Sequence, residues 1–147
     1  MNESKLITTL ADAFSSAKIG RKKAFVNVIT NNIPVWTAVK STPTLALYIE
    51  SSKYENKKGY STVESEVIVY VYNRHRTNTV SSDDILSDLI SVVRSTVRCI
   101  KDSNILDIGV TSSQRDGGTI HPYTMAEIVI NVSYVEDNTV CEDGSAC

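Results

Sequence analysis

The sequence predicts an α+β fold, an antiparallel or mixed β-sheet with an N-terminal helix and one long central helix packed on one face. Three observations predict it. Segments with a helical apolar period alternate along the chain with segments rich in β-branched and aromatic residues. Their order is helix, strand pair, helix, strand pair, which is typical of helices covering one face of a sheet. The chain has 147 residues without a recognisable linker, which indicates a single domain.

The first element is a predicted amphipathic helix. Residues 4–17 repeat apolar side chains at helical spacing, with Ser4 as the expected cap and Gly20 where helices commonly stop. Four cations follow, where they would complement the helix dipole: Lys18, Arg21, Lys22 and Lys23. Residues 24–40 carry no firm prediction, because a short apolar run that could be a strand is followed at once by turn residues.

A pair of strands is expected next. From Thr44 apolar and polar residues alternate, which predicts a strand with one buried face. Residues 63–72 are dense in β-branched and aromatic side chains and predict a second strand. The polar stretch 51–61 between them contains Lys57 and Lys58 and is predicted to be a loop. The two strands are therefore expected to pair antiparallel as a long hairpin.

The strongest helical pattern lies in the middle of the chain. Ser81 with Asp84 resembles a capping box, and apolar residues then keep helical spacing for about five turns, up to Ile100. Acidic residues gather near the start of this segment and basic residues near its end, which is the polarity that the helix dipole favours. Cys99 falls within the pattern and is expected in the core, as free cysteines usually are.

Two further strands are predicted at 105–110 and 125–134, because both segments are aliphatic. The connection 114–123 is longer than a tight hairpin needs, and its Asp116-Gly117-Gly118 turn and Pro122 fit a protruding loop. Loops of this kind often contact other molecules.

The C-terminal residues differ from the rest in composition. The sequence is acidic and without periodicity from residue 136, which predicts one domain over residues 1–135 and a flexible acidic tail over 136–147. The tail contains Cys141 and Cys147, which we expect to be reduced and exposed. A disulfide between them, or with another chain, is the alternative.

The sequence contains no recognisable catalytic or metal-binding constellation. Neither His75 nor His121 has a cysteine, histidine or carboxylate at metal-ligand spacing. A phosphate-binding glycine-rich loop and a Gly-x-Ser-x-Gly nucleophile motif are both missing from the sequence. We therefore expect no cofactor, no metal and no enzymatic activity. No apolar run is long enough for a membrane span and the start does not resemble a signal peptide, so a cytosolic origin is expected.

Charge is unevenly distributed along the chain, whose net charge is −2. Residues 1–60 contain nine Lys and Arg against four Asp and Glu, whereas residues 61–147 contain six against thirteen. This asymmetry is compatible with head-to-tail association of copies, in which a basic face meets an acidic one, and equally with solvated faces. Arg74-His75-Arg76 could contact phosphates or acidic neighbours. Aromatic residues do not interleave with these charges, which disfavours the reading of nucleic-acid sequence.

The order of elements in the second half of the chain resembles a known family. A capped helix of about five turns, a strand and an Asp-Gly-Gly loop precede a final strand, Met125-Ala126-Glu127-Ile128-Val129-Ile130-Asn131-Val132-Ser133-Tyr134. This is similar to the tail-terminator (tail-completion, minor tail) proteins of long-tailed bacteriophages. The resemblance spans roughly residues 4–135 and is a pattern of elements, not a sharp motif. It implies an α+β subunit that forms a hexameric ring on the end of the tail tube, stops tube polymerisation and provides the surface for the head or neck.

The resemblance also implies partners and a location. The partners would be further copies of the chain, the tail tube protein and a head-completion or connector protein. DNA would pass the channel without being read. The location would be the tail or neck of the virion, after assembly in the host cytoplasm. Expected contact regions are 51–61, 74–77 and 114–123, and the candidate contact residues are Lys57, Lys58, Arg74, His75, Arg76, Arg115, Asp116 and His121. Two alternatives stay open: a head-to-tail connector or stopper, and a small-ligand or enzymatic α+β module.

Overall fold

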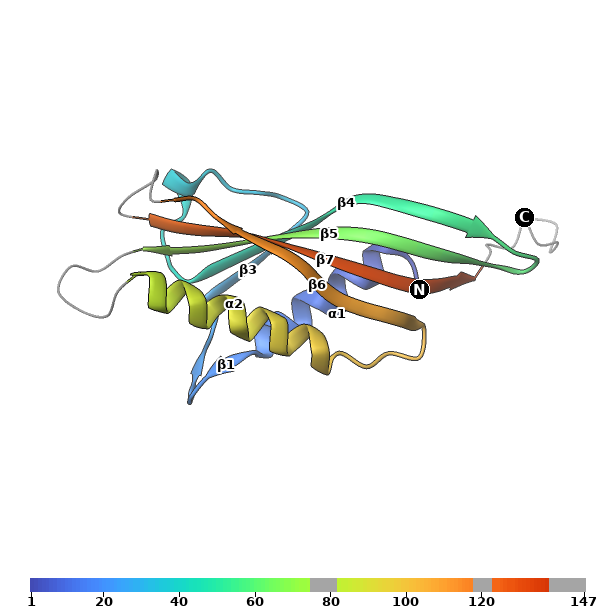
Figure 1. The fold of residues 1–147 in the computed structure, drawn as a ribbon, viewed down its shortest axis with the longest axis horizontal. Coiled ribbons are helices and arrows are strands. Elements are labelled where there is room, and N and C mark those ends of the chain that lie inside the picture. Colours follow the sequence, from blue (N-terminus) through green and yellow to red (C-terminus); the bar gives the residue numbers. More distant parts are fainter. Residues whose placement is uncertain (75–81, 118–122, 138–147) are drawn as a thin grey trace.

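A computed structural model describes residues 1–74, 82–117 and 123–137. Two helices lie against a five-stranded mixed sheet, and a small two-stranded hairpin stands apart (Figure 1). The elements are α1 (Glu3–Ser16), β1 (Lys18–Ile19), β2 (Lys22–Lys23), β3 (Asn27–Thr30), a 3-10 turn η1 (Trp36–Ala38), β4 (Thr44–Asn56), β5 (Tyr60–Arg74), α2 (Ser82–Cys99), β6 (Ile105–Arg115) and β7 (Tyr123–Asp137). The predicted α+β class is confirmed. The helices have 14 and 18 residues, so their lengths are similar and the expectation of one long central helix is not exact.

The start and end of α1 both differ from the prediction. The cap is Asn2, whose side-chain oxygen accepts a hydrogen bond from the backbone N–H of Lys5 at 2.8 Å, so the predicted Ser4 cap is wrong. The backbone is already extended at Ala17, and no cation lies in the last turn of the helix. The four cations belong to the β1–β2 hairpin, in which Gly20 adopts a positive φ of 62°. Their predicted role at the helix dipole is therefore wrong as well.

The predicted 51–61 loop is wrong, and this is the largest departure from expectation. β4 continues to Asn56 and β5 begins at Tyr60, so only three residues form the turn between them. Gly59 supplies the positive φ, 87°, that this turn requires. The polar composition is misleading because most side chains of 51–56 are exposed. Apolar alternation reveals a strand only where one of its faces is buried.

The sheet has the order β3-β4-β5-β7-β6, with β3 parallel to β4 and every other pair antiparallel. The predicted antiparallel β4–β5 hairpin is confirmed. β3 lies within 24–40, the segment without a firm prediction. β6 and β7 are longer than predicted, and they leave only residues 116–122 of the predicted 114–123 loop between them. β7 ends at Asp137, so the strand runs past the expected boundary at 135, and the remainder of the tail lies outside the described residues.

Both helices pack on the same face of the sheet, which we call the inner face (Figure 1). α1 contacts β3 and β4, whereas α2 contacts β5, β6 and β7. The buried core on this side is aliphatic and aromatic: Leu6, Leu10, Phe14, Leu45, Leu47, Val67, Val69, Val71, Leu86, Leu89, Val93, Ile128, Ile130 and Tyr134. Burial of this apolar surface is the main driving force for packing the helices on the sheet.

Among the residues that the structure describes, the opposite, outer face of the sheet is covered only at one end. There Val39, from the connection between β3 and β4, packs on Ala46 and Tyr72. The hydroxyl of Tyr72 donates a hydrogen bond to the carbonyl of Pro34 at 3.1 Å, and that of Tyr123 donates to the carbonyl of Val39 at 3.2 Å. These bonds satisfy the polar ends of two tyrosines and fix the connection on the sheet.

α2 has the predicted position, although its predicted cap Ser81 lies outside the described residues. The prediction that Cys99 is buried is wrong, because the side chain is exposed. Val93 and Val97 are spaced by one helical turn and form the buried stripe. Cys99 lies two positions after Val97, which places it on the other side of the helix at 3.6 residues per turn.

Candidate functional site

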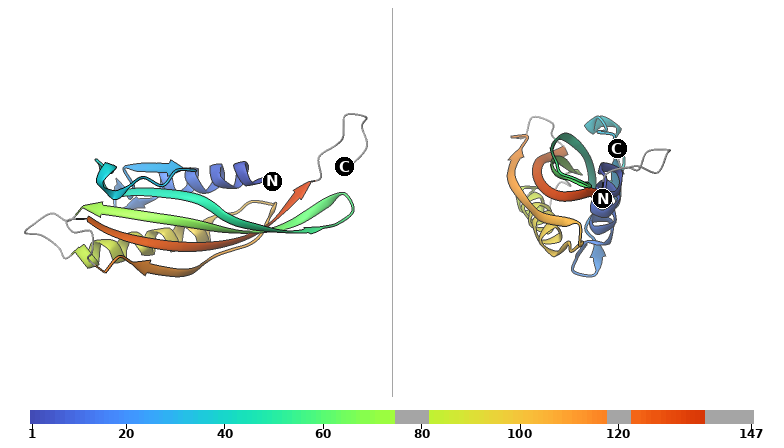
Figure 2. Two further views of the ribbon diagram at one scale, coloured as in Figure 1. Left: turned by 90° about the horizontal axis from the view of Figure 1, so that it is seen from above. Right: turned by 90° about the vertical axis from the view of Figure 1, so that its right-hand side faces the viewer.

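A three-stranded ribbon extends beyond the helices at one end of the molecule (Figures 1 and 2). It consists of residues 53–64 of the β4–β5 hairpin and 133–137 of β7, and we call it the projection. The start of α1 contacts its base. Oε1 of Glu3 accepts hydrogen bonds from the Ser52 hydroxyl at 2.7 Å and from the Tyr54 hydroxyl at 3.0 Å. The bond to Glu3 is the main cause that raises the pKa of Tyr54.

Lys57 and Lys58 lie at the tip of the projection, where sequence analysis placed a contact region. Lys57 forms an ion pair with Glu55 at 2.5 Å, and the pairing raises the pKa of Lys57 and lowers that of Glu55. Both groups are exposed, so this ion pair adds little to stability. The tip also carries Tyr60, whose side chain is 41% exposed.

Arg74, Arg115 and Asp116 lie at the other end of the sheet. The guanidinium of Arg74 stands 5.9 Å from the centroid of the Tyr123 ring, in a cation–π arrangement. Arg115 donates a hydrogen bond from Nη2 to the hydroxyl of Ser87 on α2 at 2.6 Å. The predicted contact residues His75, Arg76 and His121 lie outside the described residues.

Asp116 has a local structural role. Its backbone N–H donates to the carbonyl of Met125 at 3.1 Å, and its Oδ1 accepts from the backbone N–H of Met125 at 3.2 Å. Gly117 follows with a positive φ of 72°. These features shape the start of the β6–β7 connection, so the carboxylate helps to define the turn.

The structure therefore separates the predicted contact residues into two groups. β5 has 15 residues and connects the projection to Arg74. At about 3.3 Å per residue, the two ends of this strand are roughly 45 Å apart. The candidate residues that the structure describes do not form one site, and any contacts they make belong to two distant surfaces.

Sequence reasoning missed an acidic patch on the outer face. It comprises Glu50, Glu64, Glu66, Asp107 and Glu127, which come from all four antiparallel strands of the sheet. The register places Glu64 and Asp107 on either side of Ser133, whereas Glu66 pairs with Asn131 and Glu127 pairs with Tyr70. The alternation in β5 and β7 marked these positions as polar, but only the register shows that they share a surface.

Two tyrosines lie next to the acidic patch. The hydroxyl of Tyr70 donates a hydrogen bond to Oε2 of Glu127 at 3.2 Å. Burial, followed by a hydrogen bond with Glu50, raises the pKa of Tyr48 to about 12. In the part of the chain that the structure describes, the one salt bridge joins Lys57 and Glu55, so no carboxylate of the patch is neutralised by a salt bridge.

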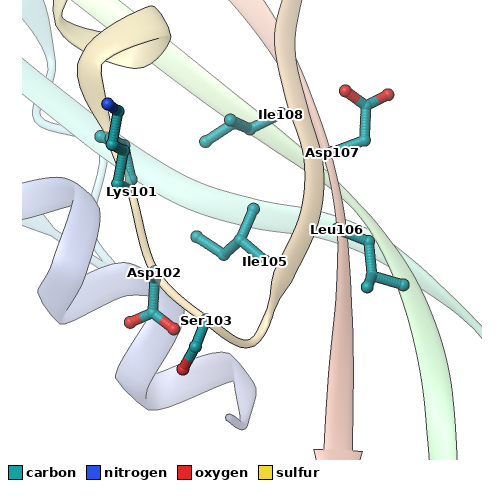
Figure 3. Close-up of a pocket in the computed structure, with 8 residues that line it drawn as sticks. Lys101, Asp102, Ser103, Ile105, Leu106, Asp107 and Ile108 are labelled. Carbon is teal, nitrogen blue, oxygen red and sulfur yellow. The ribbon is translucent and has the colours of Figure 1, made fainter.

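The surface has shallow hollows, which we examined as ligand sites. One of about 570 Å³ is lined by the single stretch 100–108 between α2 and β6 (Figure 3). Ile105 and Ile108 point to one side of β6, and Asp107 points to the other (Figure 3). Oδ1 of Asp102 accepts the backbone N–H of Asn104 at 2.8 Å, which is a local turn contact. The polar groups do not converge as they do in most small-molecule sites.

A second hollow, of about 440 Å³, lies at the base of the projection beside the acidic patch. Its lining residues are Lys53, Tyr54, Glu55, Thr62, Val63, Glu64, Leu106 and Ser133. Leu106 is 60% exposed and supplies an apolar side to this hollow. The combination of an exposed leucine with carboxylates fits a protein contact better than a cofactor site.

Comparison with protein-family models and with curated proteins finds no match for this chain. Within residues 1–74, 82–117 and 123–137, no three or more His, Cys, Asp and Glu side chains gather in a group that could hold a metal ion. Neither described helix combines the length and the apolar character needed to cross a bilayer.

Proposed function

We propose that the chain is a structural virion protein, a tail terminator whose copies form a ring that caps the tail tube and offers a surface to the head or neck. The resemblance of its element order to tail-terminator proteins of long-tailed bacteriophages is the basis of this proposal. Six copies per ring, a tube partner and a head-completion or connector partner are what the resemblance implies. The protein would assemble in the host cytoplasm and remain in the tail or neck of the virion.

The observation that carries the proposal is the projection. It reaches beyond the helices, and it exposes large apolar side chains at its base and tip: Tyr54 by 55%, Tyr60 by 41% and Leu106 beside it by 60%. A ribbon of this kind has no core of its own to bury these groups. Exposed aromatic and aliphatic side chains that gather in one region are typical of contacts with other proteins.

The separation of the two ends of the sheet also supports the proposal. A terminator must hold two different partners, one on each side of the ring. The projection and the Arg74 end lie roughly 45 Å apart along β5, which has 15 residues, so both can be occupied at once. Arginine at the second end would interact well with carboxylates of a partner or, without sequence preference, with DNA phosphates in the channel.

The test is the solution mass of the purified chain, measured by light scattering with and without tail tubes. We expect a species near six times the 16.2 kDa subunit mass, or a monomer that becomes a ring only when tubes are present. A monomer or dimer that ignores tubes would overturn the proposal. A ring that ignores tubes and binds a portal complex would favour the connector alternative.

A further inference from the structure

The β1–β2 hairpin concentrates positive charge on a protruding element. Residues 18–23 contain Lys18, Arg21, Lys22 and Lys23, all exposed, and we call this segment the basic hairpin. The register places Lys18 directly opposite Lys23. Like charges directly across a strand pair destabilise it. None of the four cations forms a salt bridge with any residue that the structure describes, so this repulsion is not relieved within the described chain.

The basic hairpin and the acidic patch lie on opposite sides of the molecule. The hairpin follows α1 and extends from the helix layer away from the sheet (Figures 1 and 2). The patch lies on the outer face of the sheet, which is turned away from the helices. One copy therefore cannot bring its own hairpin to its own patch, and a contact between the two requires a second molecule.

The two surfaces are complementary in more than charge. Ile19, in the hairpin, is 42% exposed and pairs across the ladder with Lys22. On the outer face, Leu106 is 60% exposed at the edge of the hollow of about 440 Å³, and Glu64 is among its lining residues. Asp107 shares a cross-strand row with Glu64. Ile19 is thus flanked by cations, whereas Leu106 lies beside Glu64 and Asp107, with Lys53 opposite Glu64 in the same hollow.

We propose that the basic hairpin of one copy docks on the outer face of the next copy, with Ile19 against Leu106 and the cations beside Glu64 and Asp107. The identity of the occupant, a second copy of this chain, rests on the proposed function. Because the two surfaces lie on opposite sides of each copy, one pair of molecules cannot make the contact twice, and the contact is heterologous. Repeated from copy to copy, it produces a closed ring or an open filament.

Charge reversal on each surface tests the contact. One variant carries Lys22→Glu and Lys23→Glu, and the other carries Glu64→Lys and Asp107→Lys, all at exposed positions. Like charges brought together at an interface repel each other, so each variant alone should associate at least about a hundredfold more weakly. An equimolar mixture should regain assembly, because the reversed hairpin fits the reversed patch. Light scattering at several ionic strengths gives the readout.

A matched control makes the same change of net charge at positions outside the two proposed surfaces. Lys5→Glu with Arg94→Glu reverses two exposed cations on the helices and should leave association unchanged. Circular dichroism and the thermal midpoint of each variant check that it folds. Association of the wild-type chain should weaken as salt is added, because dissolved ions screen the attraction between exposed charges on the two surfaces. If rings form only on tail tubes, the same variants are compared there by electron microscopy.

Several outcomes would overturn the contact. Rings that persist in both reversed variants would exclude it and leave the proposed ring function intact. A wild-type chain that stays monomeric up to about 1 mM at low salt, and also ignores tail tubes, would remove both proposals. If Lys22→Glu with Lys23→Glu abolishes binding to duplex DNA and leaves association of copies unchanged, the hairpin binds a nucleic acid instead.

Discussion

The sheet has two regions, the body under the helices and the projection, and their strands are stabilised by different interactions. In the body, inner-face side chains of β5 and β7 such as Val69 and Ile130 lie in an apolar core under the helices. In the projection most side chains are exposed, yet β5 stays paired with β4 on one side and β7 on the other. Beyond Val63 and Tyr134, which are buried at the base of the projection, backbone pairing continues a ribbon whose register is set by the packed region. The exposed apolar residues of the projection therefore do little for folding and remain available for contacts.

The largest effect on stability is expected in the body. Phe14 is fully buried and meets Phe25 edge to face, with ring centroids 6.4 Å apart. Phe14→Ala removes this contact and leaves a cavity, so we expect the free energy of unfolding to fall by about 3 to 5 kcal/mol. Urea denaturation of the variant and the wild-type chain measures it. A loss below about 1 kcal/mol would show that the helix layer contributes far less than its burial indicates.

The second largest effect is expected at alkaline pH, where tyrosines of the body and of the projection should contribute differently to the loss of stability. Burial is the main cause that raises the pKa of Tyr72, in the body, to about 12. Above pH 10 the unfolded tyrosine ionises while the folded one stays protonated, so stability that is complete below pH 10 is lost between pH 10 and 12. This loss is at most about 2 to 3 kcal/mol. Tyr72→Phe should flatten the decline, measured as the thermal midpoint against pH.

Tyr54 provides the control for that titration, because it lies in the projection and is 55% exposed. The bond to Glu3 also raises the pKa of Tyr54, but solvent screens this exposed hydroxyl, so Tyr54→Phe should flatten the alkaline decline less than Tyr72→Phe does. An equal flattening by the two variants would contradict the assignment of the decline to a buried tyrosine of the body.

A smaller effect is expected where the helix layer meets the base of the projection. Asn2→Ala removes the cap of α1, whose oxygen accepts the N–H of Lys5 at 2.8 Å, and should cost about 1 kcal/mol. Ser4→Ala is the matched control and should cost much less, because Ser4 is not the cap. Urea midpoints of the two variants decide between them, and a larger loss for Ser4→Ala would restore the cap expected from sequence.

The smallest effect on stability is expected at the tip. Tyr60→Ser replaces a side chain that is 41% exposed, and the free energy of unfolding should change by less than about 0.5 kcal/mol. Under the proposed function the same change should weaken the attachment to tail tubes, measured by co-sedimentation. A variant that binds tubes as the wild-type chain does would exclude the tip as a contact surface.

The helices and strands of this chain that could be predicted from the sequence are those with a buried face. The segments with a buried stripe, α1, α2, β5 and β7, were predicted in type because apolar spacing records which face is covered. The sequence does not indicate the strand over 51–56, because its side chains are mostly exposed and its polar composition resembles that of a loop. Cys99 was misplaced because residue type was weighed above its angle around the helix.

The candidate surfaces were harder to predict than the elements. Lys57 and Lys58 lie in a turn that is much shorter than the expected loop, and Arg74 is the last residue of β5 and not part of the expected link. Sequence could not show that they mark opposite ends of one sheet. Glu50, Asp107 and Glu127 share one face only through a register that joins distant segments, so no local pattern indicates their patch. The basic hairpin was explained by a helix end that the structure places earlier.

The central position of β5 has a consequence for how fast backbone amides exchange with solvent. β5 is paired on both sides from Ser61 to Tyr72, so its amides there should exchange slowly even where its side chains are exposed to solvent. β4 differs, because among the described strands β3 accompanies it only from Thr44 to Leu47. Beyond that point every second amide of β4 points away from β5 and should exchange rapidly. In the projection, protection of the amides from exchange should therefore alternate from one residue to the next along β4 and be nearly uniform along β5.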